Sequence, residues 1–325
     1  MNDSIILRNL GSSDLKLTSI GLGTWQFSKR KNLMGRFWPY LSEEESHEIV
    51  TTTFHHGVNW FDTAEAYGKG ESEKTLSRAL QHASIKDRDI AIATKWNPFF
   101  RTAHSINSTI DKRLSALHPY TISLYQVHNP YSFANIRSEM QAMASLIKKH
   151  KIQYVGVSNF SADQMYKAYD ELNKHGIKLV SNQVLYSLVN RKIEYNGILE
   201  MAQKLGMAII AYSPLAQGVL TGKYHENPDL IRQKKGFRKW MGTFKKKGLD
   251  KSRPLIEKLR EIAGYYNVTP AQVALNWTVN YHGNTIFAIP GASNTQQAES
   301  NAKAMQISLS DADKNQIEQL SLHSH

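Results

Sequence analysis

The amino-acid sequence predicts an α/β protein whose strands close into a (β/α)8 barrel. Eight short runs of apolar and β-branched residues alternate with longer segments of helical periodicity. Most of these runs lack strict polar–apolar alternation, as is typical of parallel strands buried on both faces. Eight strand–helix units favour the TIM-barrel arrangement over an open doubly wound sheet, which remains the alternative. The stretch "GLGTWQ" lacks the third glycine of G-x-G-x-x-G, which argues against a Rossmann fold.

Individual elements carry their own start and stop signals. Capping boxes predict helices that begin after Ser42, Ser161 and Thr269, and the last has proline at its first helical position. Gly176 and Gly206 stand where two helices must stop before the next strand. The eight predicted strands are, in chain order, Ser19–Gly23, Val58–Phe61, Ile90–Lys95, Ile122–Val127, Ile152–Val157, Leu179–Val184, Met207–Tyr212 and Thr285–Ile289.

Two segments lie outside the strand–helix repeat of what we expect to be one domain, residues 1–325. We expect residues 5–18 to form a short hairpin before the first barrel strand, with its turn at Gly11–Asp14. Residues 214–254 form a long insertion after the seventh strand, and long loops inside compact domains are usually functional or disordered. Within this insertion, residues 232–253 contribute +9 of the formal net charge of +12.

Composition excludes several classes of protein. The chain has no cysteine, which rules out disulfides, thiolate metal sites and thiol nucleophiles. Its start, "MNDSIILRNLGSSD", lacks the pattern of a secretory signal, and no stretch approaches the roughly 20 apolar residues of a membrane span. We therefore expect a cytoplasmic protein. Because the charge outside the basic segment is near neutral, a general nucleic-acid-coating role is disfavoured.

Polar and aromatic side chains follow most of the predicted strands. The active site of a TIM barrel is built at the carboxyl ends of its strands, so these side chains are candidates for chemistry. In strand order they are Thr24 and Trp25, Asp62 and Tyr67, Lys95 and Trp96, His128 and Asn129, Ser158 and Asn159, Gln183, and Tyr212 and Ser213; Pro290 and Gly291 follow the last strand.

Four of these residues suit proton transfer to a carbonyl group. An ordinary tyrosine has a pKa of about 10, but a lysine ammonium at ~4 Å is worth roughly 4 kcal/mol, or ~3 pKa units, in favour of the tyrosinate. We therefore expect Tyr67 to lie within a few ångströms of the Lys95 amine. Asp62 would keep that lysine charged. A neutral His128 on the other side of the hydroxyl would orient a carbonyl or relay the proton, and such a tuned acid contributes ~10²–10⁴ in rate.

Seven stretches in order carry a family resemblance: "GLGTW", "NWFDTAEAYG", "ATKW", "QVHNP", "GVSNF", "AYSPLAQGVLTGKY" and "IPGA". Together they resemble the aldo-keto reductases, and the resemblance runs from about Leu7 to Asn301. "GVLTGKY" and the long loop after it look most like a bacterial branch related to potassium-channel β subunits. The resemblance implies that Asp62, Tyr67, Lys95 and His128 are the catalytic residues, and that a nicotinamide cofactor delivers hydride while Tyr67 donates the proton.

The resemblance also implies a set of binding residues. Those for the cofactor, with Tyr212 stacked on the nicotinamide, are Gly23, Thr24, Trp25, Asp62, Ser158, Asn159, Gln183, Tyr212, Ser213, Leu215, Gly218, Lys223, Arg238, Gly291, Ser293, Gln297 and Asn301. Those for the substrate pocket are Trp25, Tyr67, Trp96 and His128, although both tryptophans could instead only cap the barrel mouth. Ser158, Asn159 and Gln183 could also simply satisfy loop backbone groups.

The cofactor preference follows less directly. Many relatives that use NADPH place a basic residue soon after the last strand, whereas "GASNTQQAESNA" (291–302) has none and contains Glu299. We predict NADPH, with the basic segment 232–253 closing over the phosphates in place of that residue. NADH remains the alternative, and the basic segment could instead be only a solvated surface.

The function predicted is reduction of aldehydes or ketones, with a small carbonyl compound rather than a nucleic acid or a membrane as partner. The alternative is a cofactor-binding regulatory or redox-sensing subunit with little turnover. Barrel hydrolases fit poorly, because Gly23, Thr24 and Trp25 stand where a metal-dependent enzyme needs paired histidines. Glycosidases need two opposed carboxylates, and Asp62 is the only acid at a strand end. No metal site is predicted.

Overall fold

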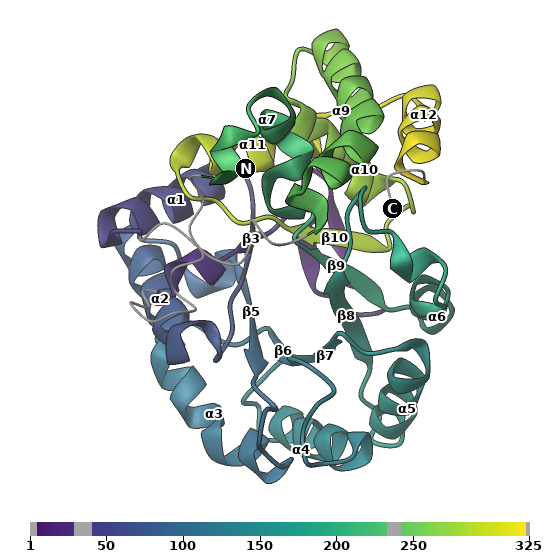
Figure 1. Ribbon diagram of the computed structural model, residues 1–325. Helices are drawn as coiled ribbons and strands as arrows, with labels where there is room; N and C mark the ends of the chain where they lie inside the picture. The colour runs from purple at the N-terminus through teal and green to yellow at the C-terminus, as the bar shows by residue number, and fades with distance from the viewer. Residues whose placement is uncertain (1–4, 29–40, 233–241, 323–325) are drawn as a thin grey trace.

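Eight parallel strands close on themselves in the computed structural model, which describes residues 5–28, 41–232 and 242–322. The strands are hydrogen-bonded in the sequential order β3 to β10. Two parallel bridges, Ile20 to Ala288 and Gly23 to Gly291, join the first strand to the last. The predicted TIM barrel is therefore confirmed, and the open sheet is excluded (Figure 1).

Each barrel strand overlaps the segment predicted for it. The bounds are β3 Leu22–Gly23, β4 Trp60–Asp62, β5 Ala91–Trp96, β6 Leu124–Val127, β7 Tyr154–Ser158, β8 Leu179–Leu185, β9 Ala208–Tyr212 and β10 Ile286–Ile289. Their residues are almost all buried, because side chains fill the barrel on one face and meet the helices on the other.

Helices surround the barrel, as Figure 1 shows. Their bounds are α1 Glu43–His55, α2 Glu71–His82, α3 His104–Leu117, α4 Ile136–Lys148, α5 Ala162–Asn173, α6 Ile198–Leu205, α7 Lys223–Glu226, α8 Asp229–Arg232, α9 Lys246–Tyr266, α10 Pro270–Asn280, α11 Thr295–Lys303 and α12 Asp311–Leu322. The capping boxes at Ser42, Ser161 and Thr269 are all formed, and Gly206 ends α6 in the left-handed conformation. These local signals were sufficient to fix the helix starts.

A two-stranded hairpin precedes the barrel, as predicted. Its antiparallel strands are β1, Leu7–Asn9, and β2, Lys16–Thr18. Leu10 and Leu17 pack against Trp60 in an apolar cluster inside the barrel, and the Trp60 indole donates to the Thr18 carbonyl at 2.9 Å. The hairpin thus covers the amino-terminal end of the barrel and leaves the carboxyl-terminal end for the site.

The insertion after β9 is more ordered than its composition indicated. We expected a loop through residue 254, but α9 already begins at Lys246, so the prediction was wrong for its last nine residues. Leu249 and Leu255 are buried and supply the apolar face of that helix, whereas Pro254 and the lysines around it had concealed the pattern. Val219, Tyr224 and Phe244 form a small apolar cluster of their own within the insertion.

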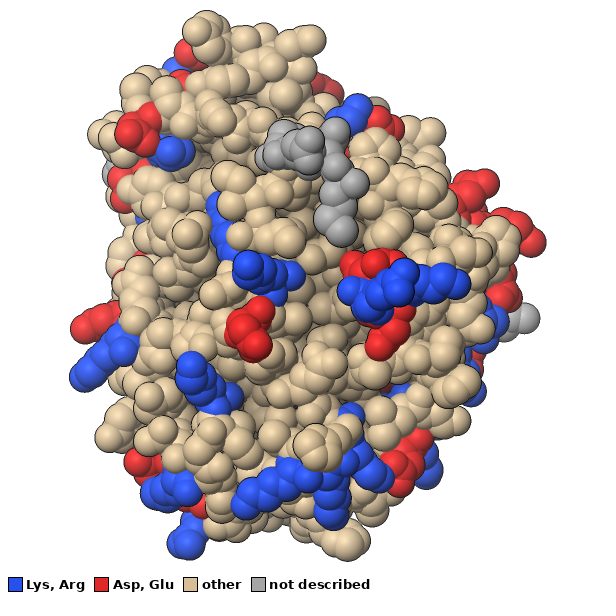
Figure 2. Space-filling model, turned by 180° about the vertical axis from the view of Figure 1, so that it is seen from behind, with Lys and Arg blue, Asp and Glu red and all other residues tan. Residues whose placement is uncertain are grey.

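The surface carries both signs of charge. On the face shown in Figure 2, acidic and basic side chains are interspersed, which agrees with a chain whose excess charge lies in one segment. Among the residues that the structure describes, no helix is long and apolar enough to cross a membrane.

Candidate active site

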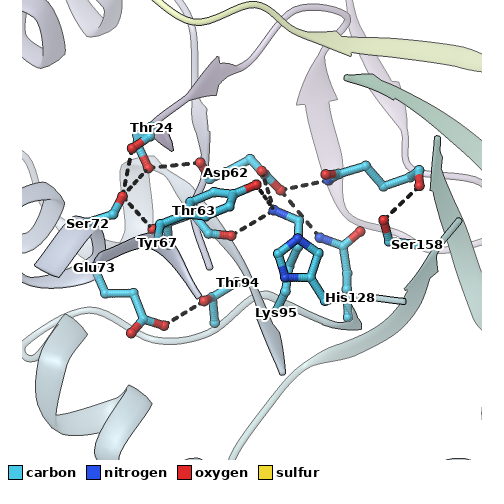
Figure 3. A network of polar contacts seen from close by, with 12 residues as sticks. Thr24, Asp62, Thr63, Tyr67, Ser72, Glu73, Thr94, Lys95, His128 and Ser158 are labelled. Carbon is cyan, nitrogen blue, oxygen red and sulfur yellow. Dashed lines mark hydrogen bonds and ion pairs between the residues drawn. The ribbon is translucent and has the colours of Figure 1, made fainter. Parts of the chain in front are cut away.

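The four predicted catalytic residues converge at the carboxyl-terminal end of the barrel (Figure 3). Lys95 on β5 is the centre of the cluster. Its Nζ donates to Asp62 Oδ1 at 2.5 Å, to the Thr63 carbonyl at 2.8 Å and to the Tyr67 hydroxyl at 3.5 Å. The His128 ring packs against the Tyr67 ring, with ring centroids 5.7 Å apart and an edge-to-face angle of 76°. The expected proximity of the Tyr67 hydroxyl to the Lys95 amine is therefore confirmed.

Tyr67 reaches this position through a short turn after β4. β4 and β5 pair in parallel with Asp62 opposite Ala93, so Asp62 and Lys95 lie on neighbouring strands. The chain then turns into the 3-10 helix η3, Tyr67–Lys69, where Gly68 has φ of 68°. A Cβ at Gly68 would lie 2.4 Å from the Ser28 carbonyl oxygen, so only glycine lets the turn approach that segment.

The lysine–aspartate pair is buried and fully compensated. Their side chains are 0% and 1% exposed. The second Asp62 oxygen accepts from Gln183 Nε2 at 2.8 Å and from Gln126 Nε2 at 3.4 Å. Burial opposes the charge on Lys95, but Asp62 and the nearby Tyr67 hydroxyl outweigh it, so the pKa of Lys95 is raised. Lys95 therefore stays an ammonium although its side chain is completely buried.

The pKa of Tyr67 departs from the sequence-based expectation. We expected Lys95 to lower it by ~3 units, but the net shift is upward from the ordinary value of 10. Burial of the hydroxyl is the largest cause, and the negative charge of Asp62 adds to it, while Lys95 pulls in the opposite direction. The error arose because the expectation took account of the lysine charge and left out burial of the hydroxyl, the largest cause, as well as the charge of Asp62.

His128 is neutral at physiological pH. Burial, together with the charge of Lys95, lowers the pKa of His128 to about 3. A neutral imidazole beside the Tyr67 ring can donate or accept one hydrogen bond without adding charge, as the sequence-based hypothesis required.

Three of the residues predicted to hold a nicotinamide form a connected polar group. Asn159 has a left-handed backbone, with φ of 61°. Its side-chain amide donates to the His128 carbonyl at 3.3 Å and to the Ser158 hydroxyl at 3.1 Å, and its oxygen accepts from the Tyr212 hydroxyl at 3.1 Å. The Gln183 side chain points instead to Asp62. These residues are thus organised around the tetrad rather than scattered over loops.

The segment after β9 combines several strained backbone positions. Ser213, Ala216 and Gln217 have φ of 52°, 47° and 55°, although none is glycine, and Gly218 has φ of 97°. Successive turns of this kind form concave nests of backbone N–H groups that bind anions. Lys223 lies beside Gly218, since a Cβ built on that glycine would be 3.5 Å from the lysine Nζ. Leu215, also predicted as a cofactor residue, packs against the core.

The residues predicted to bind adenosine lie after β10. Gly291 pairs with Gly23 at the barrel seam, and Asn301 donates to the Gly291 carbonyl at 3.3 Å. The Ser293 amide donates to Gln297 Oε1 at 2.9 Å. The remaining predicted cofactor residue, Arg238, lies outside the described residues.

The first strand end contributes one buried and one exposed residue. Thr24 is fully buried. Its hydroxyl donates to the Asp62 carbonyl at 2.9 Å and lies 2.9 Å from the Ser72 hydroxyl (Figure 3). The Thr24 side chain therefore helps to hold the end of β4 in place. Trp25 is 44% exposed, and its ring centroid is 6.3 Å from that of Tyr67. The Trp25 side chain is therefore partly exposed to solvent beside Tyr67, at the carboxyl-terminal end of the barrel.

Trp96 does not belong to the substrate pocket, and that prediction was wrong. Its side chain is completely buried in the main apolar core, and its indole donates to Ser105 Oγ on α3 at 3.0 Å. Successive residues of a strand point to opposite faces, so Lys95 facing the barrel interior sends Trp96 to the helix side.

Sequence reasoning missed the residues that support the tetrad. Gln126 on β6 binds Asp62, and Glu65, Glu73 and Arg113 form ion pairs next to the turn between β4 and α2 that carries Tyr67. Gln126 could have been found as a polar residue in an apolar strand. The ion pairs could not have been found from the sequence, because Arg113 is far along the chain from both glutamates. Within the described residues, no group of three or more histidine, aspartate or glutamate side chains could hold a metal ion.

Comparison with known proteins gives the same result. Residues 19–322 match the model of the Aldo/keto reductase family. The chain is 36% identical over 299 residues to an uncharacterized oxidoreductase of Mycobacterium bovis, covering 91% of this chain and 86% of that protein. It is 28% identical over 310 residues to the L-glyceraldehyde 3-phosphate reductase of Escherichia coli K12, covering 92% and 87%. A solved thermostable aldo-keto reductase in complex with the inhibitor epalrestat superposes with a TM-score of 0.77 at 26% identity over 97% of this chain and all of that one. The chain belongs to the aldo/keto reductase family of oxidoreductases.

Proposed function

We propose that this protein reduces aldehydes or ketones to alcohols with NADPH as the hydride source and Tyr67 as the proton donor. The observation that carries the proposal is the Tyr67 hydroxyl, 3.5 Å from a buried, aspartate-paired lysine ammonium and next to a neutral histidine. A carbonyl oxygen that gains negative charge needs such donors close by.

The proposed roles of the side chains follow from their charges. The Tyr67 hydroxyl hydrogen-bonds the substrate oxygen and gives up its proton as the oxygen becomes an alkoxide. Lys95 stabilises the tyrosinate that forms. Asp62 holds the Lys95 ammonium through an ion pair, so that the ammonium lies next to the Tyr67 oxygen. Neutral His128 donates a second hydrogen bond to the substrate oxygen and fixes its direction. The bound nicotinamide would supply the hydride.

The segment after β9 and the polar group on β7 and β8 suit a nicotinamide dinucleotide. The left-handed run that ends at Gly218, with Lys223 beside it, would take the pyrophosphate. The partly exposed ring of Tyr212 would stack on the nicotinamide, whose amide would meet Ser158 and Asn159. Gln183, already bound to Asp62, would add a contact through its remaining polar atoms.

The proposed preference for NADPH over NADH rests on the basic segment 232–253, and helix α11 bears on it only through the position of Glu299. Glu299 is the acid that would repel a 2′-phosphate, but its carboxylate pairs with Lys303 at 2.6 Å and lies 3.5 Å from His56. The Glu299 carboxylate is thus paired with Lys303 and faces His56 at the end of α1. Ser293, Gln297 and Asn301 then offer neutral hydrogen-bonding groups to the adenosine.

The proposed substrate pocket comprises Trp25, Tyr67 and His128, with aromatic rings from two further loops. Phe99 and Tyr131 are exposed, and their ring centroids are 6.2 Å apart. Phe99 lies on the loop after β5 and Tyr131 on the loop after β6, which are the strand ends that present Lys95 and His128. We expect carbonyl compounds with an apolar group to fit this mouth.

Steady-state oxidation of NADPH with a panel of carbonyl compounds tests the proposal. The panel should include aromatic and aliphatic aldehydes, ketones and L-glyceraldehyde 3-phosphate, the compound named for one relative. We expect turnover with at least one aldehyde. Cofactor binding without turnover of any compound would contradict the proposal and favour the alternative of a regulatory subunit.

A further inference from the structure

A chain of alternating arginine and glutamate side chains runs beside the turn between β4 and α2 that carries Tyr67. Arg101 Nη1 lies 2.8 Å from Glu65 Oε2, and the other oxygen of Glu65 lies 3.2 Å from Arg113 Nη1. Arg113 Nε is in turn 3.0 Å from Glu73 Oε2. Arg113 comes from α3, Glu73 from α2 and Glu65 from the turn after β4, so three separate elements meet at one guanidinium.

This ion-pair chain is costly to bury. The side chains of Arg113 and Glu73 are 8% and 0% exposed. Burial raises the pKa of Glu73 to about 7, although Arg113, the Thr94 hydroxyl and Lys95 all lower it, and the negative charge of Glu65 adds to the rise. Replacement of buried ion pairs by apolar residues is often neutral or stabilising, so stability alone gives little reason for such a network. A requirement for geometry is the better-founded reason.

The network holds the segment that carries Tyr67 on both sides. Glu65 lies two residues before the tyrosine, and Glu73 lies six residues after it. Arg113 contacts both, and a Cβ on Gly70 would lie only 3.1 Å from Arg113 Nη2. The Arg113 side chain on α3 therefore contacts the chain both before and after Tyr67.

The same two carboxylates hold the segment that carries Lys95. The Thr94 hydroxyl, one residue before the lysine, donates to Glu73 Oε1 at 2.6 Å (Figure 3). The Asn97 amide, two residues after it, donates to Glu65 Oε2 at 3.1 Å. The chain segments that present the tyrosine and the lysine are thus fastened to one another through Glu65 and Glu73.

We propose that Arg113, through its ion pairs with Glu65 and Glu73, is a positioning residue that fixes the Tyr67 hydroxyl against Lys95 Nζ. This inference rests on the proposed function, because it assigns the network to the proton-donating step. The distance to be fixed is the 3.5 Å between the two groups. Misplacement of a catalytic group by about 1 Å costs roughly 10²-fold in rate.

Arg113→Met tests the proposal, with Arg137→Met as the matched control. Arg137 also pairs with a glutamate, Glu171 at 3.7 Å, but its side chain is 75% exposed. We expect Arg113→Met to lower kcat ~30- to 100-fold and to leave KM and the cofactor Kd within about threefold. Arg113→Lys should rescue little, because an ammonium cannot bridge two carboxylates as a guanidinium fork does. The control should match the wild type.

Combination with Tyr67→Phe separates positioning from a general structural effect. If Arg113 acts through the Tyr67 hydroxyl, Arg113→Met should cause no further loss of kcat in the Tyr67→Phe background. An equal fold-loss in both backgrounds would overturn the proposal. If Arg113→Met does not fold, the nearly isosteric Glu65→Gln breaks the same link and takes its place.

A second measurement does not need turnover. NMR of protein with labelled tyrosine rings, with the Tyr67 signal identified by its absence in Tyr67→Phe, gives the pKa of Tyr67 directly. Moving Lys95 away by about 1 Å should raise that pKa by roughly one unit in Arg113→Met. An unchanged pKa would overturn the positioning role. Failure of the carbonyl panel would instead overturn the proposed function and leave this readout intact.

Discussion

Replacement of Tyr67 by phenylalanine is expected to lower kcat for carbonyl reduction by ~10²–10⁴-fold. The substitution removes one oxygen atom, whose hydrogen bond within the described residues is the one from Lys95 Nζ at 3.5 Å. The ring can keep its edge-to-face packing on His128 and its contact with Trp25. The fold and the cofactor site should therefore persist while the proton donor is lost.

Steady-state rates and cofactor titration on the same preparation check this expectation. The cofactor Kd should stay within about threefold of the wild type, because the hydroxyl serves the transition state rather than binding. Tyr265→Phe is the matched control, since it removes the same oxygen from a tyrosine of α9 that is 84% exposed and lies outside the proposed site. A Tyr67→Phe variant that keeps more than about a tenth of the wild-type kcat would exclude Tyr67 as the acid.

Replacement of Lys95 by methionine is expected to abolish turnover as well, while cofactor affinity changes by less than about tenfold. Methionine has a similar length but no charge, so the tyrosinate that forms during proton donation loses its counter-charge. The Asp62 carboxylate, 1% exposed, would be left with its glutamine donors alone. Removing one partner of a buried pair costs about 3–5 kcal/mol, so the free energy of unfolding should also fall.

A double substitution separates the two consequences of losing Lys95. Lys95→Met combined with Asp62→Asn removes both charges and should recover much of the unfolding free energy without recovering turnover. Chemical denaturation and steady-state rates on both variants provide the comparison. Recovery of turnover together with stability would show that Lys95 has only a structural role.

The barrel and its tetrad could be predicted from the sequence because their signals are local. Capping boxes at Ser42, Ser161 and Thr269 involve residues three apart, and each buried strand is a short continuous run. The closure rule for barrels then brings all strand ends to one face, which is enough to gather Asp62, Lys95 and His128.

The predictions that were wrong concern features that depend on contacts between distant parts of the sequence. The pKa of Tyr67 depends on burial and on the Asp62 charge as well as on Lys95, and no sequence pattern gives their balance. The side to which Trp96 points depends on where β5 begins its alternation. The partners Glu65 and Arg113 lie on different elements that only the packing of α3 brings together.

The most direct test of the central claim is a fluorescence titration of the protein with NADPH and with NADH, side by side. The chain has six tryptophans, and Trp25 lies next to Tyr67 at the proposed nicotinamide end of the site. We expect saturable binding of both dinucleotides, with NADPH the tighter of the two. A protein that binds neither would contradict the reductase assignment, whatever the geometry of its tetrad.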